Sequence, residues 1–236
     1  MENVVERSLA GIELFSELEP EALKRLSEAC RWRRYRRGER ILEEGTASRE
    51  VMFVVEGAVS ILGPRDSGRE VAYAVLEQGS HIGELAALDG EPRSASVVAR
   101  CNSLIAVMPA ERFLRLLQDD GRVALKLLRN LSARIRSGDL RILELSTLAA
   151  TQRVYAELLR RAVPDAAVPE LWIVRPLPPM REIASHASTT RETVARALGQ
   201  LYPSGLLRRK GRNLYLMDRT ALQQKIYAWQ LESSVK

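Results

Sequence analysis

The feature that most constrains the fold is a change in the spacing of apolar residues at Pro109. From Trp32 to Pro109 the chain runs through short, β-rich segments separated by Gly, Pro, Asp and Ser: RWRRYRRGERILEEG, EVMFVVEGAVSILGP, REVAYAVLEQG, SASVVAR and SLIAVMP. Many short strands at this spacing are typical of a small barrel or jelly roll. In front of them, SELEPEALKRLSEACR predicts a helix with Pro20 near its first position, capped by Ser16 or Glu19.

Arginines crowd the first of these segments, at positions 31, 33, 34, 36 and 37. They could form a nucleic-acid-binding patch. Alternation on an exposed edge strand also explains them, because charged edges discourage pairing with another sheet. We therefore expect this segment to be an edge strand.

After Pro109 the helical period returns and continues from about Ala110 to Ala162. A heptad register runs through it, with positions at alternating spacings of three and four: Ala124, Leu128, Leu131, Ile135, Gly138, Ile142, Leu145 and Ala149. This seam favours a dimeric coiled coil over a long helix lying on its own barrel. Gly138 weakens the helix by about 1 kcal/mol relative to alanine and leaves a gap in the seam.

Five prolines in RRAVPDAAVPELWIVRPLPPM end the helical period. The following REIASHASTTRETVARALGQLYPSGLLRRKGRNLYLMD predicts two short helices around HAST and a hairpin with Gly211 at its tip, the pattern of a winged helix-turn-helix. Thr190 is expected to cap the second helix, where Arg191, Glu192 and Arg196 suit the edges of guanine and cytosine. The alternative for Glu192 and Arg196 is an ion pair on a solvated helix.

The basic charge of the chain is concentrated toward its C-terminal end. Residues 150 to 236 contain 14 Lys and Arg and 7 Asp and Glu, a net charge of +7, whereas the residues before them carry a net charge of −1. Arg208, Arg209, Lys210 and Arg212 of the hairpin belong to this excess. A basic small domain joined to a nearly neutral larger one suggests a reader of a polyanion, although a basic face can also be a solvated surface. Combined with the helix-turn-helix pattern, the charge predicts binding to double-stranded DNA.

Several other classes of protein are not expected. No apolar run approaches the roughly 18 residues that a membrane span needs, so we expect no membrane contact. The first residues lack a secretory signal and only two cysteines are present, Cys30 and Cys101, which indicates a reducing cytoplasm. No Ser/His/Asp set, metal cluster or phosphate loop is recognisable, so we expect neither an enzyme nor a metal site.

Two stretches, GELAALDGEPRSA and TTRETVARAL, together resemble the bacterial cyclic-AMP receptor and fumarate-nitrate regulator family of transcription factors. The resemblance extends over nearly the whole chain, from LFSELEPEALKRL to the hairpin. It implies an α+β chain with a cyclic-nucleotide-binding jelly roll at 1–120, a dimerisation helix at 121–149 and a winged helix-turn-helix DNA-binding domain at 150–236. It further implies a homodimer that recognises palindromic, TGTGA-like DNA sites and works with RNA polymerase.

The resemblance also implies that GELAAL and RSA form the phosphate cassette of a nucleotide pocket. Gly83 lets the ligand approach closely, and a short helix starting near it directs backbone N–H groups at the phosphate. Arg93 then binds the cyclic phosphate, Ser94 adds a hydroxyl donor and Glu84 accepts from the ribose 2′-hydroxyl. The expected ligand contacts are Gly83, Glu84, Leu85, Arg93, Ser94, Gly138 and Asp139, and the expected DNA contacts are Thr190, Arg191, Glu192, Arg196, Arg209, Lys210 and Arg212.

The identity of the ligand stays open at Asp139, where relatives often carry Thr or Ser. An ionised carboxylate has only acceptors, which suits the adjacent N1–H and N2–H₂ donors of guanine better than the edge of adenine. Cyclic GMP is therefore a candidate beside cyclic AMP. Asp139 can equally be a solvated residue or pair with Arg136 or Arg141.

Two alternatives concern the sensor itself. Glu84 and Arg93 can pair with each other in a regulator of the same fold that binds DNA without a cyclic nucleotide. An iron–sulfur sensor would need clustered cysteines, and a haem sensor would need axial ligands, whereas His81 and His186 are the only histidines. Neither cofactor is expected. Ser188 stands where many relatives have the glycine of the helix-turn-helix bend.

Overall fold

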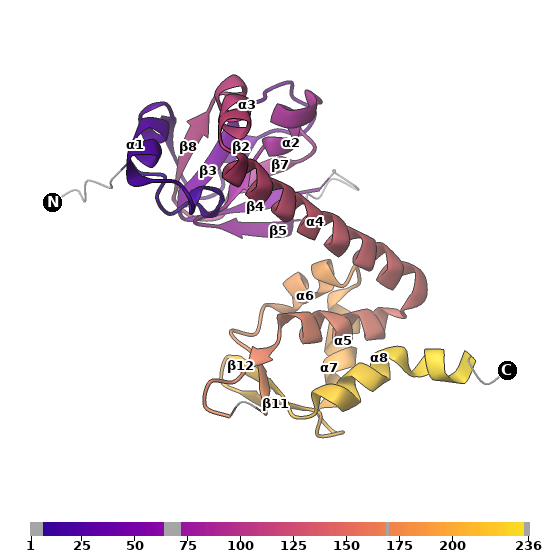
Figure 1. Cartoon of the computed structure of the whole chain (residues 1–236). Coiled ribbons are helices and arrows are strands. Elements are labelled where there is room, and N and C mark those ends of the chain that lie inside the picture. The colour runs from indigo at the N-terminus through magenta and orange to yellow at the C-terminus, as the bar shows by residue number, and fades with distance from the viewer. Residues whose placement is uncertain (1–6, 64–71, 169, 234–236) are drawn as a thin grey trace. The chain divides into compact units, whose positions relative to one another are not determined.

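The computed structural model describes residues 7–63, 72–168 and 170–233 of the chain. The chain divides into two compact units, Met1–Arg134 and Ile135–Lys236. The first unit carries two β-sheets and the first helices of the chain, and the second unit carries the last helices and a third sheet (Figure 1). This mixed architecture confirms the predicted α+β fold.

Two four-stranded antiparallel sheets form the first unit, with the strand orders β1-β8-β3-β6 and β2-β7-β4-β5. The strands are β1 (Arg31–Tyr35), β2 (Arg40–Leu42), β3 (Val51–Glu56), β4 (Ala58–Leu62), β5 (Ala72–Glu77), β6 (His81–Ile82), β7 (Ser96–Ala99) and β8 (Ser103–Met108). The jelly roll is thus confirmed. The first residues of the predicted segment REVAYAVLEQG lie outside the described residues.

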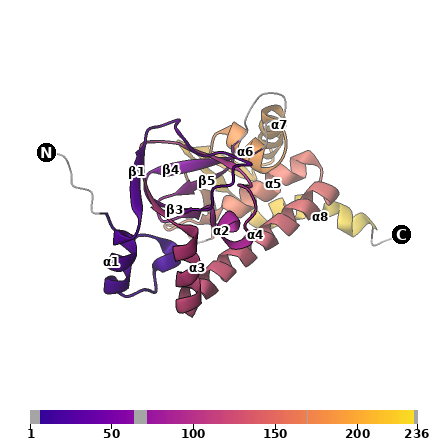
Figure 2. The same ribbon diagram turned by 90° about the horizontal axis from the view of Figure 1, so that it is seen from above.

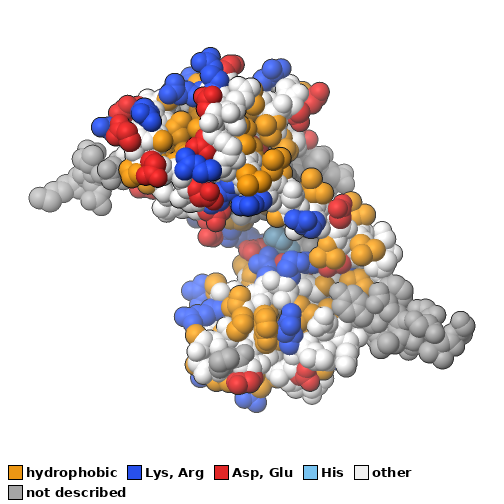
Figure 3. All heavy atoms as spheres, viewed as in Figure 1, with side chains coloured by type: hydrophobic (Ala, Val, Ile, Leu, Met, Phe, Trp, Pro, Cys, Tyr) orange, Lys and Arg blue, Asp and Glu red, His pale blue; other side chains and the backbone are white. Residues whose placement is uncertain are grey.

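Strand β1 is an edge strand, as the arginine pattern predicts. Its arginines are mostly exposed, and two of them pair with acids of the same sheet region: Arg31 with Glu50 at 3.1 Å and Arg34 with Glu56 at 3.9 Å. Acidic and basic side chains are interspersed over the face of the molecule drawn in Figure 3. This local pairing favours the edge-strand interpretation over a nucleic-acid patch.

Side chains alternate between two apolar cores along the central strands of the first sheet. In β3, Met52 and Val54 face the second sheet, whereas Val51 and Phe53 face a layer of helices. Strand β8 repeats this division. Because both faces of the first sheet are covered, its central strands read as continuous apolar runs rather than as alternating ones.

The helical layer consists of η1 (Glu13–Phe15), α1 (Pro20–Glu28), α3 (Ala110–Asp119) and the first turns of α4. Figure 2 shows α1, α3 and α4 along one side of the strands. Pro20 opens α1 with Glu19 as its N-cap, as predicted. Phe53 joins the layers, with its ring centroid 4.9 Å from that of Phe15 and 6.5 Å from that of Phe113.

The helical period predicted from Ala110 to Ala162 is present, but it is not one helix, because the chain breaks it twice. Asp120 is extended and separates α3 from α4 (Gly121–Thr147). Its carboxylate accepts from the backbone N–H of Arg122 at 3.0 Å, which starts the next helix. Ala149 is extended in turn, and the side chain of Gln152 caps it at the start of α5 (Ala150–Arg161). The seam therefore ends inside α4 at Leu145.

The second unit contains the predicted helix-turn-helix and hairpin. The helices are α5, α6 (Met180–His186), α7 (Arg191–Leu201) and α8 (Arg219–Ser233), and the strands are β9 (Val163–Pro164), β10 (Trp172–Val174), β11 (Leu207–Lys210) and β12 (Asn213–Leu216) in the order β11-β12-β10-β9. Gly211 lies between β11 and β12 with φ +60°, as expected for the tip of a hairpin.

The beginning of α8 is part of the core of this unit. Leu222 and Ile226 are buried together with Val154 and Leu158 of α5. The side-chain amide of Gln152 also donates to the carbonyl of Ile226 at 2.9 Å. The carboxylate of Asp218 caps α8 by accepting from the backbone N–H of Ala221 at 2.8 Å. We did not predict this docking from the sequence, because the apolar residues of α8 do not follow a clear one-sided spacing.

Candidate functional site

A cavity of about 480 Å³ lies in the first unit between the second sheet, α2 (Glu84–Asp89) and α4. Its apolar walls come from Leu42, Ile61, Leu76, Ile82 and Leu131. Its polar residues include Glu13, Ser80, His81, Glu84, Arg93, Ser94, Asn130 and Arg134. Five residues predicted to contact a ligand meet here: Gly83, Glu84, Leu85, Arg93 and Ser94.

Gly83 is required by the local backbone and by its neighbours. It has φ +83° and precedes the first residue of α2, so the chain turns there in the left-handed region. A Cβ atom at this position would lie 2.9 Å from the carbonyl oxygen of Glu50 and closer still to the guanidinium of Arg93. Any side chain at Gly83 would therefore displace Arg93.

Protein oxygens hold the guanidinium of Arg93 in a fixed orientation. Nε donates to Ser48 Oγ at 2.9 Å, Nη1 to the carbonyl of Gly83 at 3.0 Å and Nη2 to the carbonyl of Glu50 at 2.7 Å. The carboxylate of Glu50 lies 3.8 Å away, and the Arg93 side chain is only 2% exposed. Burial lowers the pKa of Arg93, and Glu50 and Glu84 oppose this effect, so the group stays charged.

Glu84 is not paired with Arg93. Its carboxylate is 3% exposed and forms an ion pair with Arg134 of α4, whose side chain is 62% exposed. No ion pair joins Glu84 to Arg93 among the described residues, so the alternative in which the two neutralise each other is not the arrangement found. Glu84 instead ties α2 to α4 within the first unit.

The remaining predicted ligand residues differ in their surroundings. Ser94 is exposed at the cavity and Leu85 is half-buried in its wall. Gly138 and Asp139 are exposed on α4 in the second unit, and their contact with a ligand stays a prediction. Asp139 has no ion pair with Arg136 or Arg141 within the part of the chain that the structure describes.

His81 also lines the cavity. Burial is the largest cause that lowers the pKa of His81 below its ordinary value, and Arg134 acts in the same direction, whereas Glu84 and Glu13 oppose it. The imidazole is therefore neutral at pH 7. The ring of His81 lies beside the apolar walls of the cavity.

Ser48, Glu50 and Arg134 are functional residues that sequence reasoning missed. Ser48 and Glu50 hold Arg93 from more than forty positions away, and no local pattern marks them. Arg134 is not marked either, because every arginine of α4 lies off the seam and the burial of Glu84 is known only from the structure. Ser48 and Glu50 fix the guanidinium of Arg93, and Arg134 pairs with Glu84, in a cavity that combines these charged groups with apolar walls.

The second candidate site is the exposed side of α7. Thr190 caps this helix by accepting from the backbone N–H of Thr193 at 3.3 Å, as predicted. Arg191, Glu192 and Arg196 are exposed, while the opposite side of α7 is buried in the core. Solvent-facing side chains at the start of the second helix of a helix-turn-helix are placed to reach base edges in the major groove.

Glu192 and Arg196 do not form the ion pair that was the alternative interpretation, as judged from the described residues. The pKa of Glu192 is lowered first by its own backbone N–H and then by the hydroxyl of Thr190. In the hairpin, Arg209, Lys210 and Arg212 are exposed beside Gly211. Both elements thus present charged groups to solvent.

Two further features bear on the site's chemistry. No group of three or more His, Cys, Asp or Glu side chains is placed to hold a metal ion in the described ranges. Within those ranges, none of the helices has the length and apolar character needed to cross a bilayer.

Both halves of the chain match known families. A family model described as a cyclic nucleotide-binding domain matches residues 32–120, and one described as a Crp-like helix-turn-helix domain matches residues 152–225. The cAMP-activated global transcriptional regulator Vfr of Pseudomonas aeruginosa is 30% identical over 201 residues, which are 81% of this chain and 92% of that protein. The cyclic AMP receptor protein of Thermus thermophilus is 31% identical over 85% of this chain and 90% of its own length.

Solved structures agree with these relatives. The Thermus thermophilus catabolite activator protein is 28% identical, covers 91% of this chain and 98% of its own, and superposes with a TM-score of 0.53. FixK2 from Bradyrhizobium japonicum is 27% identical with a TM-score of 0.61, over 83% of this chain and 96% of its own. The chain therefore belongs to the cyclic-AMP receptor and fumarate-nitrate regulator family of transcription regulators, and it joins a cyclic nucleotide-binding domain to a DNA-binding helix-turn-helix domain.

Proposed function

We propose that the protein is a homodimeric transcription regulator that binds a cyclic nucleotide in the cavity at Arg93 and then recognises a palindromic, TGTGA-like DNA site. The observation that carries the proposal is the cavity itself, where Gly83, Glu84, Arg93 and Ser94 meet. The relatives named as cAMP-activated regulators support the same function. The proposed setting is the cytoplasm, with RNA polymerase as the further partner.

The phosphate of the ligand binds Arg93 in this proposal. Ser48, Gly83 and Glu50 take three of the N–H donors of Arg93, which leaves two for a cyclic phosphate. The guanidinium needs no reorientation when the phosphate arrives, because these oxygens already fix its plane. Ser94 adds a hydroxyl, and the buried carboxylate of Glu84 accepts from the ribose 2′-hydroxyl.

Dimerisation through α4 is proposed from exposed apolar side chains at heptad spacing. Leu128, Ile135 and Ile142 are 60%, 64% and 65% exposed, although each is a large aliphatic residue on one helix. Apolar residues repeating every seven positions pack against the same positions of a second helix. Two copies would then present two α7 helices, which suits a palindrome.

Cyclic AMP and cyclic GMP are the two candidate ligands. The relatives' names favour cyclic AMP. The carboxylate of Asp139 is exposed and has no ion pair among the described residues, which favours guanine because its N1–H and N2–H₂ are adjacent donors. Titration calorimetry with both nucleotides on the wild type and on Asp139→Thr decides between them. An unchanged ratio of the two affinities in the variant would show that Asp139 does not select the base.

DNA binding is tested by fluorescence anisotropy with a palindromic TGTGA duplex and a scrambled duplex. We expect tight binding only with nucleotide and only to the palindrome. Binding that ignores nucleotide would favour the same-fold regulator without a ligand. Calorimetry separates the regulator that needs a nucleotide from the one that does not. Arg93→Lys should show a large loss of nucleotide affinity, while Arg100→Ala, which changes an exposed arginine outside the cavity, should match the wild type. Equal heats for Arg93→Lys and wild type would contradict the proposed pocket.

A further inference from the structure

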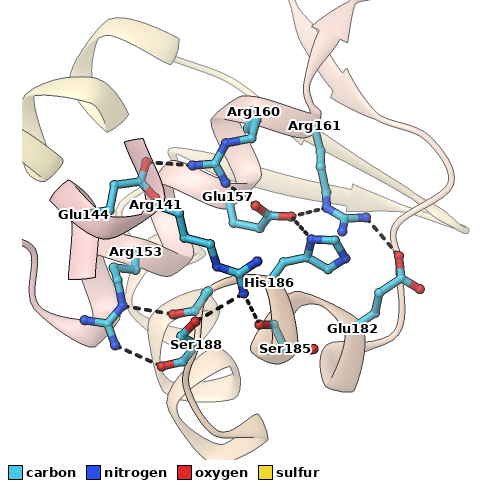
Figure 4. Close-up of polar contacts among 11 residues, drawn as sticks. Arg141, Glu144, Arg153, Glu157, Arg160, Arg161, Glu182, Ser185, His186 and Ser188 are labelled. Atoms are coloured by element: carbon cyan, nitrogen blue, oxygen red, sulfur yellow. Dashed lines mark hydrogen bonds and ion pairs between the residues drawn. The ribbon is translucent and has the colours of Figure 1, made fainter. Parts of the chain in front are cut away.

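The bend between α6 and α7 is held by arginines from two different helices (Figure 4). From α5, Arg153 donates to the carbonyls of Ala187 at 2.9 Å and Ser188 at 3.0 Å. From α4, Arg141 donates through Nη2 to the carbonyl of Ser185 at 2.9 Å and to the hydroxyl of Ser188 at 3.2 Å. Ser185 lies in the last turn of α6, and Ala187 and Ser188 directly follow that helix. The carbonyl of Ser185 also accepts from the backbone N–H of Ser188 at 3.2 Å.

Ser188 has an unusual backbone for a serine. Its φ is +47°, and it is the one non-glycine residue with positive φ in the described part of the chain. It follows the end of α6 at the place where glycine is usual, and the N–H of Thr189 donates back to Ala184 at 2.9 Å. Glycine would adopt this conformation without strain, whereas a serine here carries a cost in backbone free energy.

The hydroxyl of Ser188 supplies a contact with α4. The Ser188 side chain is exposed, so apolar packing does not explain it. Arg141 is half-buried and reaches the hydroxyl directly. An ion pair of Glu144 with Arg160, at 2.6 Å, connects α4 to α5 but involves no residue of the bend. Among these contacts, the one from Arg141 to Ser188 alone links α4 to a side chain of the bend.

We propose that Arg141 is a positioning residue that couples α4 to the recognition helix α7 through Ser188. The bend leads within three residues to Arg191, the first residue of α7. A displacement of α4 would move Ser188 through this hydrogen bond and so reorient the start of α7. Without the hydrogen bond, the orientation of α7 would no longer depend on the position of α4. The inference rests on the proposed function, because the state of α4 is taken to be set by nucleotide and dimer.

The test compares Arg141→Ala, Ser188→Gly, the double variant and Arg136→Ala, an exposed arginine of α4 without a contact to the bend. DNA affinity is measured by anisotropy with and without saturating cyclic AMP, and in a parallel series with cyclic GMP. The ratio of the two affinities should fall by about fivefold or more in Arg141→Ala and Ser188→Gly, and no further in the double variant, because both changes remove one contact.

Thermal stability separates coupling from simple destabilisation. Ser188→Gly should keep or raise the Tm, because glycine relieves the positive φ, and yet it should lose the nucleotide response. Arg136→Ala should keep both. Ratios within twofold of the wild type in Arg141→Ala and Ser188→Gly would overturn the proposal.

The proposed function can fail separately. A wild type that ignores nucleotide contradicts that function, and the Arg141 contact is then judged by amide hydrogen exchange at Ser188, Thr189 and the first turn of α7. Faster exchange in Arg141→Ala and Ser188→Gly than in Arg136→Ala supports the positioning role, and equal exchange overturns it. This measurement requires neither DNA nor ligand.

Discussion

Arg93 is committed to the protein before any ligand arrives, since a serine hydroxyl and two backbone carbonyls fix its guanidinium. One of those carbonyls belongs to Gly83, which also leaves the space that the guanidinium occupies. The missing side chain at Gly83 therefore makes room for the Arg93 guanidinium, rather than mainly for the ligand. This differs from the sequence interpretation, in which Gly83 mainly allowed the ligand to approach.

Gly83→Ala should damage the pocket more than an ordinary glycine substitution. The added Cβ would meet Arg93 and the Glu50 carbonyl, and the residue would still need positive φ, so we expect a loss of about 1–3 kcal/mol in unfolding free energy together with loss of nucleotide binding. Gly90→Ala is the matched control. Gly90 also has positive φ, +78°, but its Cβ would meet only the Arg49 side chain at 3.5 Å or more. Retained nucleotide affinity in Gly83→Ala would refute the role given to its missing Cβ.

His186 makes the stability of the second unit depend on pH. Burial is the largest cause that lowers the pKa of His186, and Arg161 and Arg141 add to it, while Glu157 and Glu182 oppose it. A folded-state pKa below the unfolded value of about 6.5 favours the neutral form, so this contribution is present above pH 6.5 and is lost as the pH falls below it. The Tm should therefore drop between about pH 7 and pH 5.

His186→Gln should flatten this dependence in Tm measurements across that range. His81 has a lowered pKa for a similar reason, so His81→Gln is measured in parallel, because it should leave the part due to His186 in place. An unchanged pH profile in His186→Gln would show that the histidine does not cause the slope.

At the scale of elements, the Glu84–Arg134 ion pair ties α2 to α4 in the first unit. Arg134→Ala would leave a buried carboxylate without its cation. We expect the free energy of unfolding, measured with denaturant, to fall by about 1–3 kcal/mol. This is less than for a fully buried pair, because Arg134 is exposed. Glu84→Gln/Arg134→Ala should recover part of that loss, since the charge is gone. If the double variant loses as much unfolding free energy as both single variants added together, the ion pair does not stabilise the contact between α2 and α4.

Some elements of the fold could be predicted from local sequence and others could not, for physical reasons. Strands, helix-turn-helix and hairpin follow from local spacing and turn residues, and the cap at Thr190 and the hairpin tip at Gly211 were confirmed. The apolar spacing continues through Asp120 and Ala149, where side-chain capping interrupts the helix, so the spacing alone does not show these breaks. A periodic pattern records which face is apolar, not whether the backbone stays helical.

The candidate site shows the same limit. GELAAL and RSA are close in sequence, so their meeting at one cavity could be predicted from the resemblance. The partners Ser48, Glu50 and Arg134 come from distant segments and are brought in by the sheets and α4. Long-range partners of this kind depend on the tertiary fold, which no local pattern encodes.

At the scale of the whole molecule, the excess of basic charge and the large exposed aliphatic side chains lie in different parts of the chain. The excess of +7 beyond residue 149 accompanies the helix and hairpin proposed to contact DNA. The large exposed aliphatic side chains instead gather on α4, including Leu128, Ile135 and Ile142. Aliphatic residues exposed at heptad spacing on one helix are unfavourable in water, so a second copy of α4 is the expected cover.

Ile135→Asp should therefore dissociate the dimer. A charge placed in the middle of a coiled-coil seam loses its water on association, whereas in a monomer it stays solvated at a position that is 64% exposed. Sedimentation velocity should show a dimer for the wild type and a monomer for the variant at the same concentration, with unchanged circular dichroism. DNA affinity for a palindrome should fall toward that for a single half-site. Leu140→Asp, which lies off the seam and is 46% exposed, should remain dimeric. A dimeric Ile135→Asp, or a Leu140→Asp that dissociates equally, would place the interface elsewhere than along this register.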